Sequence, residues 1–512
     1  MRRYQKANEG IHAPEEVKER ASRPAGRRYH VRWMGAVAAV LAVVILCGVA
    51  LRPGQTYDPN PMSLEGPSTP PGRGFSPILT PVPTAQAVTL AAAVYPETAP
   101  YPKEEDYISS TGTFDYDKYS RAYDAWQAGR EALASGTDYA GMADEFLSAS
   151  TAQFLANAGT ENLVYSPLNV YMALSMLAET TGGNSRQQLL DLLGAESVES
   201  LRAFAAALWR DNYRDDGAVT SLLANSLWLR DGTTYSQDVL DTLAADYYAS
   251  SFSGEMGTEE YDQALRNWLN EQTGGLLREQ ADGLSMDAET VLALASTVYF
   301  KAAWSSEFEK YLTDRDTFHA PTGGVETDFM RSSAQRTYYW GDHFAAVALS
   351  FKQGGSMWLI LPDEGYSVDE LLDSGEAMDF LLTARYGYDN SKFLTVHLSM
   401  PKFDVSSELD LIGGLEALGV TDVFDYHVSD FGPLKASTDY PLYVSQARHA
   451  ARVKVDEEGC EAAAFTLIGI GEATAMPPQD EVDFILDRPF LFAITGDSGL
   501  PLFTGVVNQP NG

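Results

Sequence analysis

Residues 453–478 read VKVDEEGCEAAAFTLIGIGEATAMPP and are the most informative stretch of this 512-residue chain. A strand-like triplet, 453–455, leads into the stretch, two prolines at 477 and 478 close it, and few large side chains lie between them. A loop of about 20 residues without structure of its own is uncommon in a compact domain and is usually functional or disordered. Proteases also cleave exposed loops of small residues readily. The stretch therefore predicts an exposed functional loop.

Small residues alternate within this loop. Cys460, Ala462, Ala464 and Thr466 occupy every second position, so in a β-strand their side chains would point to one face. Small uncharged side chains enter a sheet without clashes and without burying a charge. One interpretation is a spare strand held outside a sheet; the other is a flexible Ala- and Gly-rich loop with no switching role. The stretch alone leaves both open.

Composition and charge exclude several classes of protein. The chain is 45% hydrophobic and 21% charged, which is ordinary for a globular protein and excludes wholesale disorder. Residues 1–32 carry a net charge of +5 within a total of −35, so the remaining 480 residues carry −40. That charge repels phosphate backbones, so we expect no nucleic-acid partner. Two cysteines, Cys47 and Cys460, and seven scattered histidines provide no metal-ligand spacing. We expect no metal and no cofactor.

An uncharged segment near the N-terminus suggests a membrane anchor. Residues 34–51 contain no charge over 18 positions, and at about 1.5 Å per residue a helix of that length is close to one hydrocarbon thickness. We predict a basic cytoplasmic segment at 1–33, a single-pass signal anchor in the cell membrane at 34–51, and an extracellular C-terminal part. The alternatives are a signal peptide cleaved after the small residues Gly48-Val49-Ala50, which would make the protein secreted, and a buried core helix.

The rest of the chain divides into a spacer and a folded domain. Residues 52–102 contain 12 of the 25 prolines, and 103–137 are acidic and Tyr-rich, so 52–137 is predicted to be a stalk, with a helix around 118–134. From 138 to 512 the pattern is globular. Ser166-Pro167 is typical of a helix start, and residues 394–400 alternate like a half-buried strand. Helices dominate the first half and strands the second, which favours an α+β fold.

One tetrapeptide resembles a catalytic motif. Gly496-Asp497-Ser498-Gly499 is similar to the nucleophile loop of trypsin-like proteases, but only 14 residues follow Ser498. That is too few for a specificity pocket and its flanking strands. We interpret the tetrapeptide as a hairpin turn and do not expect an enzyme. A surface hydrolase that uses Ser498 is kept as a rival hypothesis.

Seven segments together resemble one family, the serpins, which are serine-protease inhibitors that trap their target by inserting a loop. EEGCEAAA at 457–464 looks like the family's hinge, with Cys460 where Thr, Ser or Val is usual. Six further motifs follow the family's order along the chain: NLVYSPL at 162–168, GNSR at 183–186, ANSLW at 224–228, VYFKAAW at 298–304, PKF at 401–403 with the segment 411–419, and RPFLF at 488–492. The resemblance covers about 370 residues.

The resemblance implies an α+β fold with a large central mixed β-sheet, two further sheets, about eight or nine helices and an exposed reactive-centre loop. It also implies roles for particular residues. The hinge would comprise Glu457, Glu458, Gly459, Cys460, Glu461, Ala462, Ala463, Ala464 and Thr466. A polar cluster where the sheet opens would comprise Ser166, Asn169, Ser296 and His449, with Asn169 and Ser296 standing where the family usually has Ser and Asn. Lys301 and Trp304 would lie at the top of the sheet.

The resemblance further implies a suicide inhibitor. Counting 17 residues from Glu457 places the scissile bond at Ala473–Thr474, with the neighbours from Glu472 to Met476 left open. Alanine before that bond suits an elastase-like or subtilisin-like serine protease as the partner, and we expect a monomer. The alternative is a non-inhibitory binding protein with the same fold.

Overall fold

The computed structural model describes residues 87–510 except 140, 157, 276, 279–282, 289, 436–441 and 461–479. All of these residues belong to one compact unit that begins at residue 75. The predicted cytoplasmic segment at 1–33 and anchor at 34–51 lie outside the described residues. Among the residues that are described, no helix is long and apolar enough to span a bilayer.

The first sheet is large and mixed, as predicted. Its strand order is β1-β5-β4-β6-β14-β13-β12, and the short β3 also pairs with β4. Strands β4 and β5 are parallel, whereas β4 and β6 are antiparallel. The strands are β1 (Val88–Ala91), β3 (Arg214–Asp215), β4 (Val219–Arg230), β5 (Ala249–Gly254), β6 (Leu292–Ala303), β12 (Phe403–Asp410), β13 (Arg448–Val455) and β14 (Gly459–Cys460).

Within the described residues, the strands of the two further predicted sheets form one continuous nine-stranded sheet, the second sheet. Its order is β15-β11-β8-β9-β10-β16-β17-β2, with β7 also paired to β8. The 18-residue β8 joins the parts because it pairs in turn with β7, β11 and β9. The strands are β2 (Leu163–Tyr165), β7 (Asp314–Ala320), β8 (Gly323–Trp340), β9 (Phe344–Ser350), β10 (Ser356–Pro362), β11 (Ser391–Pro401), β15 (Glu481–Ile485), β16 (Phe490–Thr495) and β17 (Pro501–Val507).

Ten α-helices occur in the described part of the chain, nine of them after residue 138, in agreement with the predicted number. They are α3 (Tyr116–Leu133), α4 (Asp144–Leu155), α5 (Pro167–Thr180), α6 (Gly183–Leu193), α7 (Val198–Asn212), α8 (Gln237–Asp246), α9 (Glu259–Gln272), α11 (Val368–Asp373), α12 (Glu376–Ala384) and α13 (Ile412–Ala417). Helix α5 begins as the sequence predicted: the Ser166 side chain caps it by accepting the Asn169 N–H. Almost every residue of α5 is buried, because it runs through the interior.

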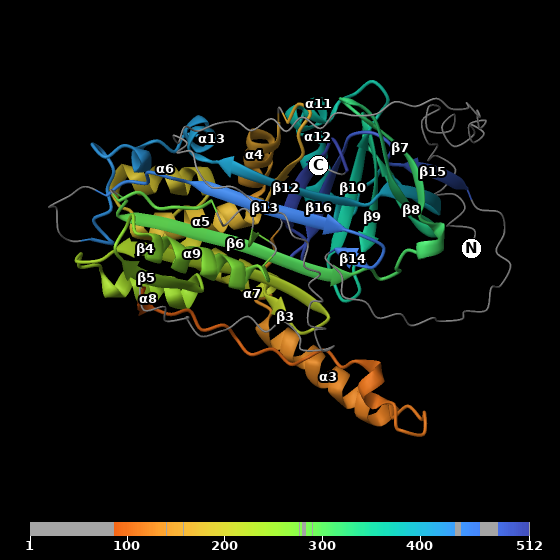
Figure 1. The fold of residues 1–512 in the computed structure, drawn as a ribbon, viewed down its shortest axis with the longest axis horizontal. Helices are drawn as coiled ribbons and strands as arrows, with labels where there is room; N and C mark the ends of the chain where they lie inside the picture. The colour runs from red at the N-terminus through yellow and green to blue at the C-terminus, as the bar shows by residue number, and fades with distance from the viewer. Residues whose placement is uncertain are drawn as a thin grey trace, which may run out of the picture. The chain divides into compact units, whose positions relative to one another are not determined.

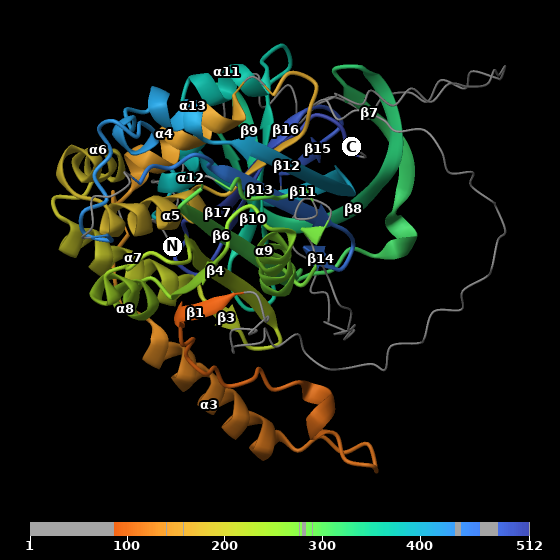
Figure 2. The same cartoon turned by 60° about the vertical axis from the view of Figure 1, so that its left-hand side comes forward.

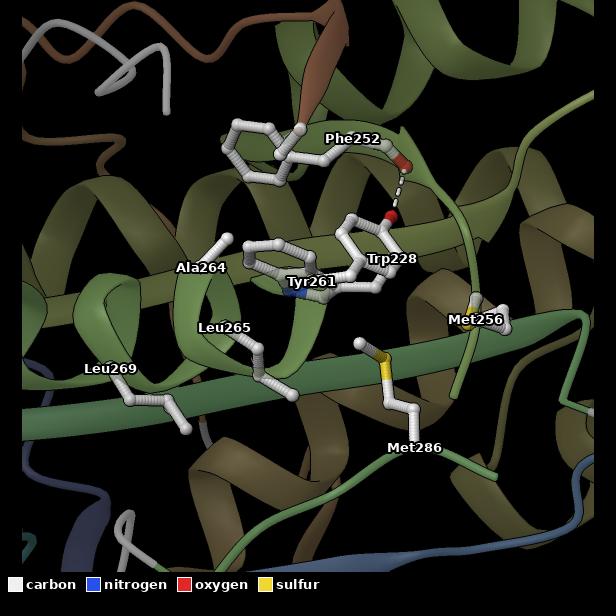
Figure 3. Packing of buried hydrophobic residues seen from close by; sticks show 9 residues of the cluster. Trp228, Phe252, Met256, Tyr261, Ala264, Leu265, Leu269 and Met286 are labelled. Carbon is white, nitrogen blue, oxygen red and sulfur yellow. Dashed lines mark hydrogen bonds between the residues drawn. The ribbon is translucent and has the colours of Figure 1, made fainter. Parts of the chain in front are cut away.

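Helix α9 packs against β4 and β6 of the first sheet (Figure 1). Its apolar side faces a buried cluster around Trp228, Phe252 and Met286 (Figure 3). The Tyr261 hydroxyl lies 3.2 Å from the Phe252 carbonyl and 3.1 Å from that of Leu229, so a single phenol ties α9 to two strands. This packing covers one face of the first sheet over β4, β5 and β6.

Part of the predicted stalk belongs to the folded unit. Strand β1 pairs antiparallel with β5, so residues 88–91 extend the first sheet rather than forming a free spacer. The helix predicted around 118–134 is α3, at Tyr116–Leu133. Figure 2 shows α3 on the side of the molecule where β1 and β3 lie. The sequence did not predict this packing, because the aromatic residues that mediate it have their partners far away in the chain.

Candidate functional site

The described part of the hinge is a tight turn followed by a two-residue strand. Oδ1 of Asp456 accepts the N–H groups of Glu458 (2.9 Å) and Gly459 (3.3 Å), and the Asp456 N–H donates to the Gly459 carbonyl at 3.1 Å. A Cβ at Gly459 would lie 2.2 Å from the carbonyl oxygen of Ala302 on β6. Glycine is therefore required by the close approach of β14 to β6. The hinge residues Glu461, Ala462, Ala463, Ala464 and Thr466, and the proposed bond Ala473–Thr474, lie outside the described residues.

Two lysines bind the hinge glutamates. Lys402 Nζ lies 3.0 Å from Glu457 Oε2, and the Thr313 hydroxyl donates to Glu457 Oε1 at 2.9 Å. Burial by itself raises the pKa of the Glu457 carboxyl, but the hydrogen bonds from Lys402, the backbone and Thr313 outweigh it and hold that pKa below its usual value. Lys310 donates to Glu458 Oε1 at 2.6 Å. The root of the loop is thereby fixed to the body of the protein.

The short strand β14 separates β6 from β13 at one end of both strands (Figure 1). Gly459 and Cys460 pair with Ala303 and Ala302 of β6, and Cys460 also pairs with Val455 of β13. The far edges of both strands are occupied, since β4 pairs along β6 and β12 along β13. Among the described residues no ladder joins β6 directly to β13. We call the space between these facing edges, beyond Cys460, the slot.

The four residues of the predicted polar cluster do lie together, beneath the slot. The backbone N–H of Ser166 donates to His449 Nε2 at 3.0 Å, and the Ser166 hydroxyl donates to the Leu502 carbonyl at 2.5 Å. The Asn169 side-chain amide donates to the Ser296 carbonyl at 3.0 Å, and the Ser296 hydroxyl contacts Asn169 Oδ1. The cluster thus links α5 to one strand on each side of the slot.

The cluster contains one residue that the sequence analysis did not assign to it. Asn225 of β4 places its Oδ1 2.6 Å from the Ser296 hydroxyl. That hydroxyl has a single proton, so it donates to Asn169 or to Asn225 at any one moment. The ANSLW motif at 224–228 contains Asn225, but a strand motif by itself does not show which distant side chain Asn225 reaches.

His449 is neutral in the folded protein. Burial lowers the pKa of its imidazole to about 4, because a charged ring would lose its hydration. Its Nε2 accepts the Ser166 N–H, so the proton of the neutral ring lies on Nδ1. The ring also meets Tyr165 edge-on at 5.4 Å between centroids.

Trp304 lies at the end of β6 that is nearest to the hinge. It is 2% exposed, its Nε1 donates to the Asp456 carbonyl at 2.9 Å, and its N–H donates to the Glu458 carbonyl at 3.0 Å. Its ring stacks on Phe351 at 4.9 Å between centroids. Lys301, the other residue assigned to the top of the sheet, is half-buried on β6 opposite Thr220.

Ser498 occupies the turn between β16 and β17, as the sequence predicted for a hairpin. Its hydroxyl donates to Asn212 Oδ1 at 2.9 Å and accepts the Leu500 N–H at 3.2 Å. A hydroxyl held by an amide oxygen has no general base to activate it. Within the described residues no group of three His, Cys, Asp or Glu side chains could hold a metal ion.

Fold and site together define a class: an α+β protein whose main sheet is entered at one end by the root of a long loop. Residues 143–510 match the family model described as "Serpin (serine protease inhibitor)". The chain belongs to the serpin family, whose members are generally protease inhibitors rather than enzymes.

Curated relatives agree with this assignment. The chain is 31% identical over 376 residues to Serpin-Z1C of Triticum aestivum, covering 71% of this chain and 93% of the relative. It is 31% identical over 396 residues to the putative serpin-Z6C of Oryza sativa subsp. japonica, covering 71% and 94%.

Solved structures agree as well. The thermophilic serpin tengpin in its native state is similar with a TM-score of 0.65 and 27% identity, covering 72% of this chain and 93% of that one. Tengpin in its latent state is similar with a TM-score of 0.59 and 26% identity, covering 72% and 96%.

Proposed function

We propose that this protein inhibits serine-type proteases as a suicide substrate, with the slot receiving the cleaved loop. The observation that carries the proposal is β14: the hinge already lies as a strand between β6 and β13 for two residues. Each further residue of the loop can extend the same pairing. The long span from Cys460 to β15 at Glu481 supplies the chain for it.

Extending the register of β14 assigns a partner to each hinge residue. Ala462 would lie opposite Phe300 and Val453, both buried. Ala464 would lie opposite Val298 and Ala451, which are also buried. Thr466 would lie opposite Ser296 and His449, the two cluster residues on the strands. Residues directly opposite share a face of the sheet, so these small side chains would point into the interior.

The chemical step is attack by the protease nucleophile on the carbonyl carbon of Ala473. The bond to the Thr474 nitrogen breaks, that nitrogen leaves as a new amino terminus, and residue 473 stays bound as an acyl-enzyme. Insertion along the 12 residues of β6 would then carry the protease about 40 Å. Hydrolysis of the acyl-enzyme stalls when the protease is distorted. Alanine at the cleaved position favours elastase-like or subtilisin-like proteases as targets.

The remaining sequence-based expectations are part of the same proposal. The inhibitory domain would span 138–512, with β1 from the preceding segment added to its first sheet, and would act as a monomer outside the cell. Residues 34–51 would anchor it to the cell membrane, or the chain would be secreted after signal cleavage. Cys460 at the start of the inserted strand is small and buried, which is compatible with insertion.

Incubation with proteases of different specificity tests the proposal. The full chain is mixed with elastase, subtilisin and trypsin, and the products are separated in SDS. We expect an SDS-stable adduct with elastase or subtilisin, and mass spectrometry of the released C-terminal fragment should show that it begins at Thr474. Cleavage without any adduct, by every protease tested, would contradict inhibition and favour the non-inhibitory alternative.

A further inference from the structure

Helix α3 lies outside the region matched by the family model, yet it contacts the body of the protein through a buried tryptophan. Trp126 is 2% exposed, and its Nε1 donates to Asp216 Oδ2 at 3.0 Å. Asp216 lies in the turn between β3 and β4 of the first sheet. The Trp126 ring also meets two guanidinium groups, Arg130 at 5.2 Å and Arg214 at 5.6 Å from its centroid. Such contacts stabilise the ring and both cations.

The same helix also contacts the second sheet. Arg130 Nη2 lies 2.6 Å from Asp497 Oδ2, in the turn between β16 and β17. Arg214 forms a buried ion pair with Asp216 at 2.8 Å and lies 3.6 Å from Asp497. These five residues, which we call the corner clasp, are Trp126, Arg130, Arg214, Asp216 and Asp497. The corner clasp therefore joins one corner of the first sheet to a turn of the second.

This corner is close to the hinge. Strand β4 begins at Val219, which lies opposite Ala302 of β6, and Ala302 in turn lies opposite Cys460. One row of paired residues thus runs from the start of β4 to the hinge. Arg214 also donates to the carbonyl of Gln353, two residues beyond the Phe351 ring that stacks on Trp304. The corner clasp and the hinge therefore share neighbours.

Opening of the slot would displace this corner. For a new strand to lie between them, β6 and β13 must be two strand spacings apart, about 9.6 Å, along their length. Some of their Cα atoms lie within 8 Å of each other, so the two strands must move apart. Strand β6 is paired along its length with β4, and β4 with β5, so these strands move together. Strand β12 stays with the second sheet, since the Ser407 hydroxyl donates to the Val164 carbonyl of β2 at 2.6 Å. The corner clasp spans the boundary between the moving and the stationary strands.

We propose that the corner clasp restrains the first sheet from opening and so slows entry of the loop into the slot. The effect on the rate of loop insertion rests on the proposed function. The restraint on opening of the first sheet can be measured without a protease. Loss of the buried hydrogen bond from Trp126 to Asp216 weakens the restraint by about tenfold in the opening equilibrium. Loss of the partly exposed Arg130–Asp497 pair weakens it by about threefold. The exposed, solvent-facing remainder of α3 should have no such effect.

The test compares three variants of the full chain by hydrogen–deuterium exchange and mass spectrometry. Arg130→Ala removes the contact with Asp497, and Trp126→Phe keeps a ring but removes the hydrogen bond to Asp216. Arg121→Ala is the matched control, because Arg121 is exposed on the same helix and donates to the Asp117 carbonyl within it. We expect backbone amides at 302–304 and 457–460 to exchange about tenfold faster in Trp126→Phe, about threefold faster in Arg130→Ala and at the wild-type rate in the control.

Faster exchange confined to residues 116–139 would overturn the inference, because the contacts would then hold only α3 in place. Unchanged exchange everywhere would overturn it too. Adduct formation with elastase or subtilisin, measured in parallel, separates the two proposals. Faster exchange at the hinge with no adduct from any variant would refute the proposed function and support the restraint. Adducts that form at the same rate in every variant, with unchanged exchange, would support the proposed function and refute the restraint.

Discussion

Strands β5, β4 and β6 form a block with two edges, and these edges differ in how they are paired. Its outer edge, at β5, is closed by β1 from the N-terminal extension. Its inner edge, at β6, is paired by β14 for two residues. An unpaired strand edge is a template for any extended chain. Strand β1 of the N-terminal extension thus occupies the outer edge, whereas most of the inner edge has no backbone partner among the described residues. A new strand is therefore more readily added at β6 than at β5.

Cleavage of the loop should produce the largest change, because it would fill the inner edge. About ten new ladder hydrogen bonds contribute roughly 1 kcal/mol each. At about 1–2 °C per kcal/mol for a folded unit that runs from residue 75 to 512, they correspond to a rise in melting temperature of roughly 10–20 °C. Calorimetry of intact and loop-cleaved protein measures it. Equal melting temperatures would mean that the slot does not accept the loop.

The substitution Ala464→Arg should block filling of the inner edge. In the extended register residue 464 faces Val298 and Ala451, so the guanidinium would be buried without a partner at a cost of about 3–5 kcal/mol. We expect the variant to be cleaved as a substrate with no SDS-stable adduct. Ala464→Ser is the control at the same position and should still form the adduct. Undiminished inhibition by the arginine variant would refute the register.

Acidification should weaken the strands that flank the inner edge, through His449. Its pKa is about 4 in the folded state and about 6.5 when unfolded, so below pH 6.5 the unfolded state binds the proton more readily. The stabilising contribution is present above pH 6.5 and is lost as the pH falls towards 4, by up to about 3 kcal/mol. His449→Gln cannot titrate, so its unfolding free energy should depend less on pH in that window. Parallel pH profiles for the two proteins would contradict this account.

The smallest effect is expected at the corner next to the outer edge. Burial, followed by the charge of Asp216, raises the pKa of Asp215 to about 6. The folded state therefore holds this proton more tightly, and stability is lost as the pH rises through 6. Asp215→Asn should raise the unfolding free energy at pH 7.5 by about 1 kcal/mol, because solvent screens part of the interaction. At pH 4.5, where the carboxyl is protonated, the difference should become small; an equal gain at both pH values would exclude the charge as its cause.

The two edges also differ in how far the sequence predicted them. At the inner edge, the alternation of small residues and the motifs around Ser166 and Trp304 indicated which strands would meet, and the family resemblance implied the position of His449. At the outer edge, residues 88–91 were predicted to be part of the spacer, and that prediction was wrong. The high proline content of 52–102 does not show whether a short segment within it pairs with a strand that is far away in the chain. Asn225 was missed for a related reason, since its contact with Ser296 depends on the register of two strands that are far apart in the chain.

Local order along the chain is what this amino-acid sequence determines by itself: which stretches alternate, where α5 begins, and that every second residue from Cys460 to Thr466 is small and uncharged. Which of those stretches become neighbours is decided in three dimensions. The joining of two sheets through β8, the addition of β1 and the meeting of Trp126 with Asp216 all depend on pairing between distant segments. Such pairing follows from burial and hydrogen bonding summed over the whole fold, and no window of neighbouring residues contains that sum.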